Sequence, residues 1–598
     1  MAKETITGPN LMGPITYQEL PIGCTFIGKP PFTISTGMWR YARPEMRKKN
    51  SPCTEACLIG QDIRKWIKFL RKGEIDKACD AVFEENPFPG IVSRVCSHPC
   101  EDACNRKQYD DALIVHDIER YISDWAILNK YKIAPLALKD KKCNIGIIGS
   151  GPAGLACAYF LCKTGHLVTV YEALSVTGGM LRTGIPEYRL PKNIVDEEIK
   201  RIQDMGVKIE TNIRVGTDIS FNTLKEKHDS LFIAQGFEIS SHLNIEEGDF
   251  DKVLYGLPFL KQINSGQLPE FSGSVAIIGG GNVAVDCARS AKRINNPDVQ
   301  LFCLESVDEI PAFPDEISEA MEEGIVFNFS VAPQNIEIAN GVNQIKFIKV
   351  LSEKSVLSEK SDDRKILSFS PIKGTEFYKK FDYVIIAVGQ TSNIDYLSKA
   401  VDICGNKIVI DDQCMTSENG IFAGGDIAEK VLSVPAAIAS GKRAAIFMDQ
   451  YLSGKKRLSE AKPGDKSQVM SMREYLGNDD SKNKPSRQQT IEFERINTAY
   501  FDRQIKEKTE KITVSERIKS FSEVNLTLSE KKMLSEADRC FTCGDCSACD
   551  TCLIFCPDMA INKNRDTLNN DIDYQFCKGC GICVNECPTG YIDLEKEK

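Results

Sequence analysis

The chain has 598 residues, of which 42% are hydrophobic and 27% are charged, so it can bury the cores of several globular domains. Its net charge of −9 argues against nucleic acid or an anionic membrane surface as a partner. The first ten residues are polar, and no apolar run reaches the roughly 18 residues of a membrane span. Neither a secretory signal nor a membrane span is expected, and we predict a cytoplasmic protein.

The chain divides into six parts. Residues 1–50, rich in Gly and Pro, are expected to form an extended arm, and 51–140 a helical domain. Strand and helix patterns then alternate, which predicts parallel, doubly wound sheets. The remaining predicted parts are one unit at 141–270 and 380–452, a second unit at 271–379, a polar connector at 453–535 that is disordered early and helical late, and a cysteine-rich domain at 536–598.

The 24 cysteines are clustered rather than spread evenly. Ten lie from Cys540 to Cys587 and, besides Cys79, five lie from Cys53 to Cys104. In a chain without an export signal, such clusters indicate metal ligation rather than disulfides.

The first glycine loop, 149–154, follows a buried strand and reads GSGPAG. Glycines there allow a tight turn and close approach to a pyrophosphate, which the helix N-terminus stabilises. Glu172 follows the next strand, where an acid binds ribose hydroxyls. A glycine turn alone occurs in many α/β proteins, but Glu172 makes a dinucleotide site the better interpretation.

Two further segments carry a family resemblance. Residues 178–191 read GGMLRTGIPEYRLP, and Gly424-Gly425-Asp426 precedes PAAI at 435–438 and Gly441-Lys442. Over roughly residues 51–452 the chain resembles the glutamate synthase small-subunit family, whose core also occurs in the N-terminal half of dihydropyrimidine dehydrogenase. The resemblance implies that 141–270 and 380–452 bind FAD, with the aspartate at the ribityl chain. The expected FAD-binding residues are Gly149, Gly151, Pro152, Ala153, Gly154, Glu172, Gly179, Arg182, Gly425 and Asp426.

A second strand, glycine loop and helix begin at 275, and this unit is expected to bind the nicotinamide nucleotide. NADPH-using members of the family carry Tyr-Arg-Arg where this chain has Leu304-Glu305-Ser306. A carboxylate repels a 2′-phosphate and accepts hydrogen bonds from a free 2′-hydroxyl, so we predict NADH over NADPH. The alternative is that Glu305 is a solvated surface acid. The expected nucleotide-binding residues are Gly279, Gly281, Asn282, Val283 and Glu305.

Two four-cysteine runs near the C-terminus, each ending in Cys-Pro, have the spacing of bacterial two-cluster ferredoxins. The fourth cysteine of each run crosses to the other [4Fe–4S] cluster. Zinc knuckles use paired ligands and fit this spacing poorly. The predicted ligand sets are Cys546, Cys549, Cys552 and Cys587 for one cluster, and Cys577, Cys580, Cys583 and Cys556 for the other.

The N-terminal cysteines predict a further site. Cys96, Cys100 and Cys104 recur every four residues, so a helix would present them on nearby faces. In the family that the chain resembles, this region holds two clusters, one of which has three cysteines and an acid or amide as ligands. The resemblance implies a third cluster at Cys57, Cys96, Cys100 and Glu119.

The other N-terminal cluster of the family begins with Arg-Cys-x2-Cys-Gly, which residues 38–52 lack. The same motif stands at 539–544, where its two cysteines are surplus to the ferredoxin runs. We predict a fourth cluster held by Cys53, Cys104, Cys540 and Cys543, so that fifteen cysteines and Glu119 supply sixteen ligands. The alternatives are a missing fourth cluster or Cys24 as a substitute ligand.

The predicted fold is α/β, with two interleaved Rossmann-like domains, an N-terminal helical iron–sulfur domain and a C-terminal α+β ferredoxin-like domain. Electrons are expected to pass from NADH through FAD and the clusters to ferredoxin or an iron–sulfur partner enzyme, or in reverse, and no side-chain acid or base is required. The order of domains is similar to the iron–sulfur flavoprotein of the dissimilatory sulfite reductase system. Alternatives are a glutamate synthase small subunit or a non-catalytic subunit with a vestigial nucleotide site. A homo-oligomer is compatible with the sequence.

Overall fold

The computed structural model describes most of the chain. The described residues are 36–133, 143–243, 252–271, 273–339, 342–355, 366–397, 400–454, 470–477, 489–564 and 570–597. Most of the predicted arm, including Cys24, and much of the early connector lie outside them.

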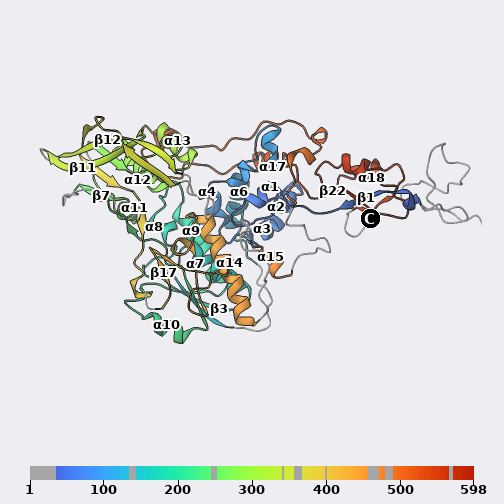
Figure 1. Ribbon diagram of the computed structural model, residues 1–598, viewed down its shortest axis with the longest axis horizontal. Helices are drawn as coiled ribbons and strands as arrows, with labels where there is room; N and C mark the ends of the chain where they lie inside the picture. The colour runs from blue at the N-terminus through green and yellow to red at the C-terminus, as the bar shows by residue number, and fades with distance from the viewer. Residues whose placement is uncertain are drawn as a thin grey trace, which may run out of the picture.

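The molecule is elongated, with the two sheets of the nucleotide-binding core at one end and the cysteine-rich cap at the other (Figure 1). The helical N-terminal domain lies between them. The cap is therefore separated from the core, and any path between them runs through the helical domain.

The first sheet is parallel and has the strand order β19-β5-β2-β3-β4. Its central strand β2 is a short apolar run buried on both faces, as expected for a strand covered by helices. The strands are β2 (Asn144–Ile148), β3 (Leu167–Tyr171), β4 (Lys208–Glu210), β5 (Ser230–Ile233) and β19 (Ile421–Ala423).

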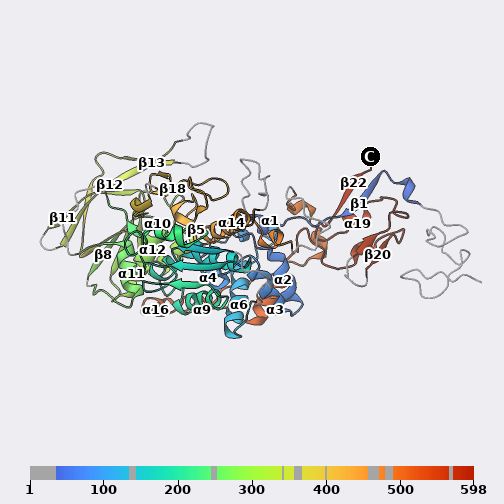
Figure 2. The ribbon, with the colours of Figure 1, turned by 90° about the horizontal axis from the view of Figure 1, so that it is seen from below.

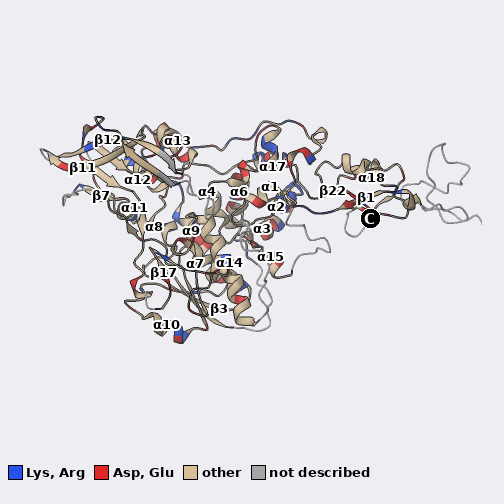
Figure 3. Cartoon of the chain, in the orientation of Figure 1, with Lys and Arg blue, Asp and Glu red and all other residues tan. Residues whose placement is uncertain are grey.

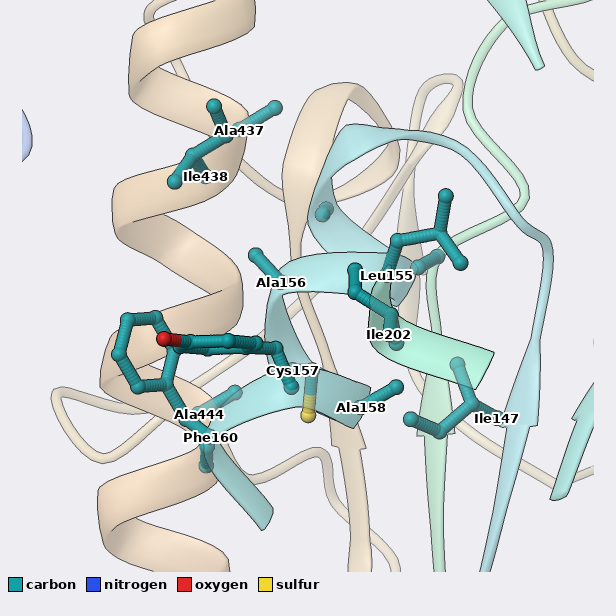
Figure 4. Packing of buried hydrophobic residues seen from close by; sticks show 14 of the residues in the cluster. Ile147, Leu155, Ala156, Cys157, Ala158, Phe160, Ile202, Ala437, Ile438 and Ala444 are labelled. Carbon is teal, nitrogen blue, oxygen red and sulfur yellow. The ribbon is translucent and has the colours of Figure 1, made fainter. Parts of the chain in front are cut away.

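Two helices, α7 (Pro152–Lys163) and α14 (Val434–Ser453), pack tightly beside this sheet. Figure 4 shows Ala156 and Phe160 of α7 beside Ala437, Ile438 and Ala444 of α14. The helices approach so closely that a Cβ on Gly441 would lie 2.2 Å from the carbonyl oxygen of Ala153. The crossing therefore holds the C-terminal part of this domain against its first glycine loop.

The second sheet is also parallel, in the order β10-β9-β8-β15-β7. Its strands are β7 (Val253–Tyr255), β8 (Ser274–Ile278), β9 (Asp298–Phe302), β10 (Val326–Asn328) and β15 (Tyr383–Ile386). Its helices are α11 (Gly256–Asn264), α12 (Asn282–Arg293) and α13 (Pro314–Glu322). An antiparallel sheet of β11 (Val331–Ala339), β12 (Val342–Ser355), β13 (Ile366–Pro371) and β14 (Phe377–Phe381) packs on one face through Phe302 and Phe347.

Short helices around a buried Trp66 form the N-terminal domain. They are α1 (Pro52–Ala56), α2 (Ile63–Arg71), α3 (Ile75–Phe83), α4 (Pro89–Val95), α5 (Pro99–Asp102) and α6 (Val115–Leu128). The prediction of one helix through Cys96, Cys100 and Cys104 is wrong. His98 has a left-handed backbone with φ of 55°, and Pro99 starts a new short helix, so Cys96 and Cys104 lie in extended segments on either side.

The cap includes a strand from the other end of the chain. β1 (Ala42–Met46) pairs antiparallel with β22 (Ile592–Lys596), as Figure 2 also shows. Thr36 and Gly37 bind the carbonyls of Phe576 and Gln575. The described part of the predicted arm thus forms the edge of the cap. The other cap elements are α18 (Thr551–Ile554), β20 (Ile561–Lys563), β21 (Asn570–Ile572) and α19 (Ile582–Asn585).

The late connector contacts both nucleotide-binding units and the helical domain. Lys511 pairs with Glu319 of α13 at 2.7 Å, and Val524 N–H donates to the carbonyl of Tyr188 at 3.0 Å. Glu523 binds Arg94 of the helical domain at 2.7 Å. Beyond the helices α16 (Val514–Arg517) and α17 (Glu530–Asp538) the late connector is largely irregular, so the prediction of a helical late connector holds only for these two segments.

Short elements complete the described structure. They are η2 (Thr36–Trp39), η3 (Asn105–Gln108), α8 (Met180–Thr183), α9 (Lys192–Asp204), α10 (Phe221–Lys227), β6 (Ile239–Ser240), β16 (Gln390–Thr391), η4 (Asp395–Leu397), β17 (Ile403–Cys404), β18 (Lys407–Ile408), η5 (Gly425–Ile427), α15 (Met472–Tyr475), η6 (Phe493–Arg495) and η7 (Thr498–Tyr500). Within the described ranges, no helix has the length and apolar character to span a membrane. Acidic and basic residues occur together along the described elements (Figure 3).

The predicted fold class is confirmed: the chain is α/β, with two nucleotide-binding sheets, an N-terminal helical domain and a C-terminal ferredoxin-like cap.

Candidate functional site

The first glycine loop joins β2 to α7, and its glycines have different physical roles. Gly149 has φ of +101°, and a Cβ there would lie 2.6 Å from the carbonyl oxygen of Ala234. A Cβ on Gly154 would lie 2.0 Å from the carbonyl oxygen of Gly149, so this glycine permits helix–loop packing. Gly151 faces open space, with no atom within 4 Å of its Cβ position. That space allows a pyrophosphate to approach the backbone N–H groups at the start of α7.

Glu172, at the end of β3, is bound to this loop. Its carboxylate accepts hydrogen bonds from the N–H and hydroxyl of Ser150 and from the N–H of Leu174. These donors fix the carboxylate beside the loop, and the carboxylate and the loop line one cavity. The position suits an acid that binds the ribose next to the pyrophosphate.

Asp426 reaches this cavity from the C-terminal part of the domain. Gly425 has φ of +70°, and its Cβ position lies 2.8 Å from the Ala153 Cβ, so a bulkier residue would separate η5 from α7. The N–H of Gly425 donates to the hydroxyl of Ser440 in α14 at 3.0 Å. Burial raises the pKa of Asp426, and Lys407 opposes that rise.

The second glycine loop joins β8 to α12 with the same geometry. Gly279 has φ of +137°, and Gly281 again has no atom within 4 Å of its Cβ position. Asn282 Oδ1 accepts from the N–H of Phe313 at 2.9 Å, which fixes the loop before α13. Glu305 follows β9, and its Oε2 lies 2.6 Å from the Cβ position of Gly280. The carboxylate is thus held over the loop rather than turned away from it.

One cavity of about 1190 Å³ connects the two loops. It exceeds the roughly 300–1,000 Å³ of a usual single-ligand pocket, as a site for two dinucleotides would. The predicted residues that line it are Gly149, Gly151, Pro152, Ala153, Glu172, Gly179, Gly425, Asp426, Gly279, Gly281, Asn282, Val283 and Glu305.

Two predicted residues do not line this cavity. Gly154 is turned toward the loop backbone, and Arg182 donates to the carbonyl of Thr177 and pairs with Asp196. Arg189 and Asp286 are among the lining residues that were not predicted, and their side chains pair at 2.8 Å between the domains. Arg189 lies within the GIPEYRLP segment, which is the sequence signal that could have indicated it.

Two small cavities in the cap are lined by the ferredoxin cysteines. Cys546, Cys549, Cys552 and Cys587 line one, together with Met46 of β1. Cys556, Cys577, Cys580 and Cys583 line the other, together with Pro44 of β1. The fourth cysteine of each run therefore lies with the first three of the other run. Met46 and Pro44 were not predicted, because no local pattern links them to cysteines some 500 positions away.

A third small cavity is lined by Cys53, Cys104, Cys540 and Cys543. Burial and the neighbouring Cys104 raise the pKa of Cys53 to about 12. Cys540 follows the end of α17, which Arg106 holds in place by donating to the carbonyl of Arg539 at 2.6 Å.

Cys57, Cys96, Cys100 and Glu119 are also neighbours. Burial raises the pKa of Cys57 and Cys96, and the charge of Glu119 contributes to both shifts. Burial raises the pKa of Cys100 too, with Cys57 as the next cause. Glu119 is buried, and its Oε1 accepts from the side-chain amides of Gln61 at 2.7 Å and Asn86 at 2.9 Å.

These donor sets fit iron–sulfur clusters. Buried thiols that raise one another's pKa are poor isolated thiolates, and a cationic iron–sulfur core offsets that cost when it binds them. Three sets offer four thiols each, and the fourth offers three thiols and a carboxylate.

Comparisons with known proteins identify the families that three parts of the chain match. Residues 143–441, half of the chain, match the pyridine nucleotide-disulphide oxidoreductase family. Residues 42–131 match the dihydropyrimidine dehydrogenase domain II, 4Fe-4S cluster, and residues 571–592 match the 4Fe-4S binding domain.

Three relatives illustrate the range of sequence identity and coverage. The chain is 35% identical to the NADP(+)-dependent formate dehydrogenase subunit beta of Moorella thermoacetica, over 67% of this chain and 60% of the relative. It is 30% identical to the glutamate synthase [NADPH] small chain of Escherichia coli, over 66% of this chain and 87% of the relative. It is 27% identical to the putative oxidoreductase YgfK of Escherichia coli K12, over 90% of this chain and 48% of the relative.

The chain thus spans about 60–65% of the length of several relatives that it matches well. From the two glycine loops, the cavity between them and these matches, it follows that the chain belongs to the pyridine nucleotide-disulphide oxidoreductase family, with the glutamate synthase small chain among its relatives.

Proposed function

We propose that this chain is an NAD(P)H-dependent flavin iron–sulfur oxidoreductase that passes electrons between a nicotinamide nucleotide and an iron–sulfur partner. FAD, when bound, accepts a hydride and releases electrons singly, which single-electron iron–sulfur carriers require. The residues of the chain supply position: Glu172 and Asp426 hold the flavin, and the second glycine loop holds the nucleotide in the same cavity.

The observation that carries the proposal is the continuity of the sites. Val95 lines the large cavity and directly precedes Cys96. Cys53 lies within the short helix α1, and Cys57 directly follows it, so this helix connects two cluster sites. Cys543 and Cys546 are three residues apart and belong to the next two sites. The crossed ligands Cys556 and Cys587 join the last two sites in the cap.

We assign four [4Fe–4S] clusters to the four donor sets, with the ligands that the sequence predicts. The electron exit is then the cap, where Cys549 and Cys580 are exposed. The partner is an iron–sulfur enzyme subunit or a ferredoxin, and the location is the cytoplasm.

Anaerobic addition of NADH or NADPH to the holoprotein should bleach the flavin absorbance and then produce reduced-cluster signals in electron paramagnetic resonance (EPR). Absence of flavin bleaching with both nucleotides would contradict the proposal.

The two alternatives are less well supported. A glutamate synthase small subunit needs no two-cluster cap, and this chain has one joined to its N-terminal strand. A vestigial nucleotide site would not be expected to keep an open Gly281 loop on a cavity shared with the flavin site.

We further propose that NADH is preferred over NADPH, although the formate dehydrogenase subunit and glutamate synthase small chain are named for NADP(+) or NADPH. The support is the position of the Glu305 carboxylate over the second glycine loop, where it would repel a 2′-phosphate. We expect wild type to show higher kcat/KM for NADH with a dye acceptor, and Glu305→Arg to shift the ratio toward NADPH by at least tenfold, or about 1.4 kcal/mol. A wild-type preference for NADPH contradicts the assignment.

A further inference from the structure

The cavity of Cys53, Cys104, Cys540 and Cys543 has a positive lining. Its charged lining residues in the described chain are Arg64 and Arg106. Arg106 is neutralised by both oxygens of Asp110, at 2.8 and 2.7 Å. Arg64 is only 2% exposed, and its Nη1 donates to the carbonyl oxygens of Lys49, at 2.7 Å, and Cys543. Its guanidinium therefore lies directly against the backbone of one ligand residue.

The charge of Arg64 is incompletely balanced. Its carboxylate neighbour is Asp62, at 3.3 Å from Nε, and Asp62 also pairs with Lys48 at 3.0 Å. The Asp545 carboxylate also acts on Arg64, and it pairs with Lys68 at 3.9 Å. Three cations thus share two anions, which leaves a net charge of about +1 beside the cavity. Because Arg64 is buried, solvent and salt screen this charge weakly.

The neighbouring site has the same formal ligand charge but different surroundings. Its donor set has the buried Glu119 carboxylate in place of one thiol. The neutral amides of Gln61 and Asn86 hold this carboxylate without cancelling its charge. The two donor sets joined by α1 therefore differ in their surroundings: the guanidinium of Arg64 lines one, and neutral amides bind the carboxylate of the other.

We propose that Arg64 raises the reduction potential of the [4Fe–4S] cluster at Cys53, Cys104, Cys540 and Cys543 above that of the cluster at Cys57, Cys96, Cys100 and Glu119. Reduction adds one negative charge to a cluster, so a buried cation beside it stabilises the reduced form. One electron then leaves the site at Glu119 and is held at the site beside Arg64, with no bond made or broken. The inference rests on the cluster assignment of the proposed function.

The test is a redox titration of the full-length holoprotein, with mediator dyes and EPR detection. The Cys540→Ser/Cys543→Ser variant identifies the signal of the cluster in question by its loss. Arg64→Gln removes the charge but keeps a donor for the Cys543 carbonyl, and Arg64→Lys keeps the charge. Lys65→Gln is the matched control, because Lys65 lies on the same helix but pairs with Glu84 and does not line the cavity.

We expect Arg64→Gln to lower the midpoint potential of the identified signal, and Arg64→Lys and Lys65→Gln to leave it near the wild-type value. An unchanged midpoint in Arg64→Gln at full iron content overturns the inference. Loss of about four irons in Arg64→Gln also overturns it, because Arg64 would then hold the site rather than tune it. If the double cysteine variant loses no iron, the cluster assignment itself fails.

Discussion

Single residues decide whether the two glycine loops can hold a dinucleotide. Gly151 and Gly281 have extended backbones that any residue adopts, with φ of −70° and −85°. Both face open cavity rather than protein atoms. Glycine at 151 and 281 therefore leaves room for the ligand, whereas the positive φ at 149 and 279 itself favours glycine.

Gly151→Ala should lose bound FAD while the polypeptide stays folded, because the added methyl occupies the pyrophosphate position. Flavin content, from the 450 and 280 nm absorbance, and thermal unfolding of the flavin-free protein check both parts. Gly281→Ala is the matched variant, and it should keep FAD but raise KM for the nicotinamide nucleotide about tenfold or more, at a cost of about 1.4 kcal/mol. Full flavin content in Gly151→Ala would show that the loop does not carry the pyrophosphate.

At the scale of elements, the contact between α7 and α14 positions the flavin half of the cavity. The N-terminus of α7 is the glycine loop, and α14 holds η5 with Asp426 through the Ser440 hydroxyl. The contact distance depends on Gly441, which lies against the Ala153 backbone.

Gly441→Ala should destabilise the protein by about 1–3 kcal/mol, since the new Cβ overlaps backbone atoms that cannot rotate away. Urea unfolding followed by circular dichroism measures the change. Gly151→Ala in flavin-free form serves as the comparison, because its Cβ meets no atom. Equal stability of the two variants would mean that the helices move apart freely.

The end of α17 is the second element that decides a site. It delivers Cys540 and Cys543 to a cavity whose other two cysteines lie more than 400 residues earlier. Changing both to Ser should remove about four irons per chain and leave the ferredoxin signals in place. Iron analysis and EPR of the reduced protein measure this, with the exposed Cys404→Ser as control. Iron equal to wild type would exclude these two cysteines as ligands.

The whole molecule has its nucleotide cavity at one end and its cap at the other (Figure 1). The late connector contacts the helical domain before it leads to the cap, and the arm runs from the cap strand β1 directly into α1, so two chain segments join the cap to the rest of the molecule. This arrangement suits an electron path with an exit far from its entry.

Removal of residues 545–598 should leave flavin reduction by the nucleotide intact, because the cavity contains no cap residue. The same deletion should abolish electron transfer to ferredoxin, since both cap clusters are lost. Removal of 36–46 alone should weaken only the cap clusters, because Pro44 and Met46 cover them. Stopped-flow flavin absorbance and ferredoxin reduction measure the two steps. Undiminished ferredoxin reduction without the cap would place the exit elsewhere.

Local patterns sufficed for the parts of this protein whose chemistry lies in contiguous residues. The glycine loops, the acid after each second strand and the two cysteine runs could be recognised because a tight turn or a cluster ligand set constrains nearby positions. The fourth set, Cys53 and Cys104 with Cys540 and Cys543, could be predicted only from the Arg-Cys-x2-Cys-Gly motif at 539–544 and from the count of ligands left over. Other features depended on tertiary structure, because they join residues that no local periodicity connects. These include the pairing of β1 with β22, the interruption of the helix at His98, the ion pair of Arg182 with Asp196, and the burial of Arg64 beside Cys543.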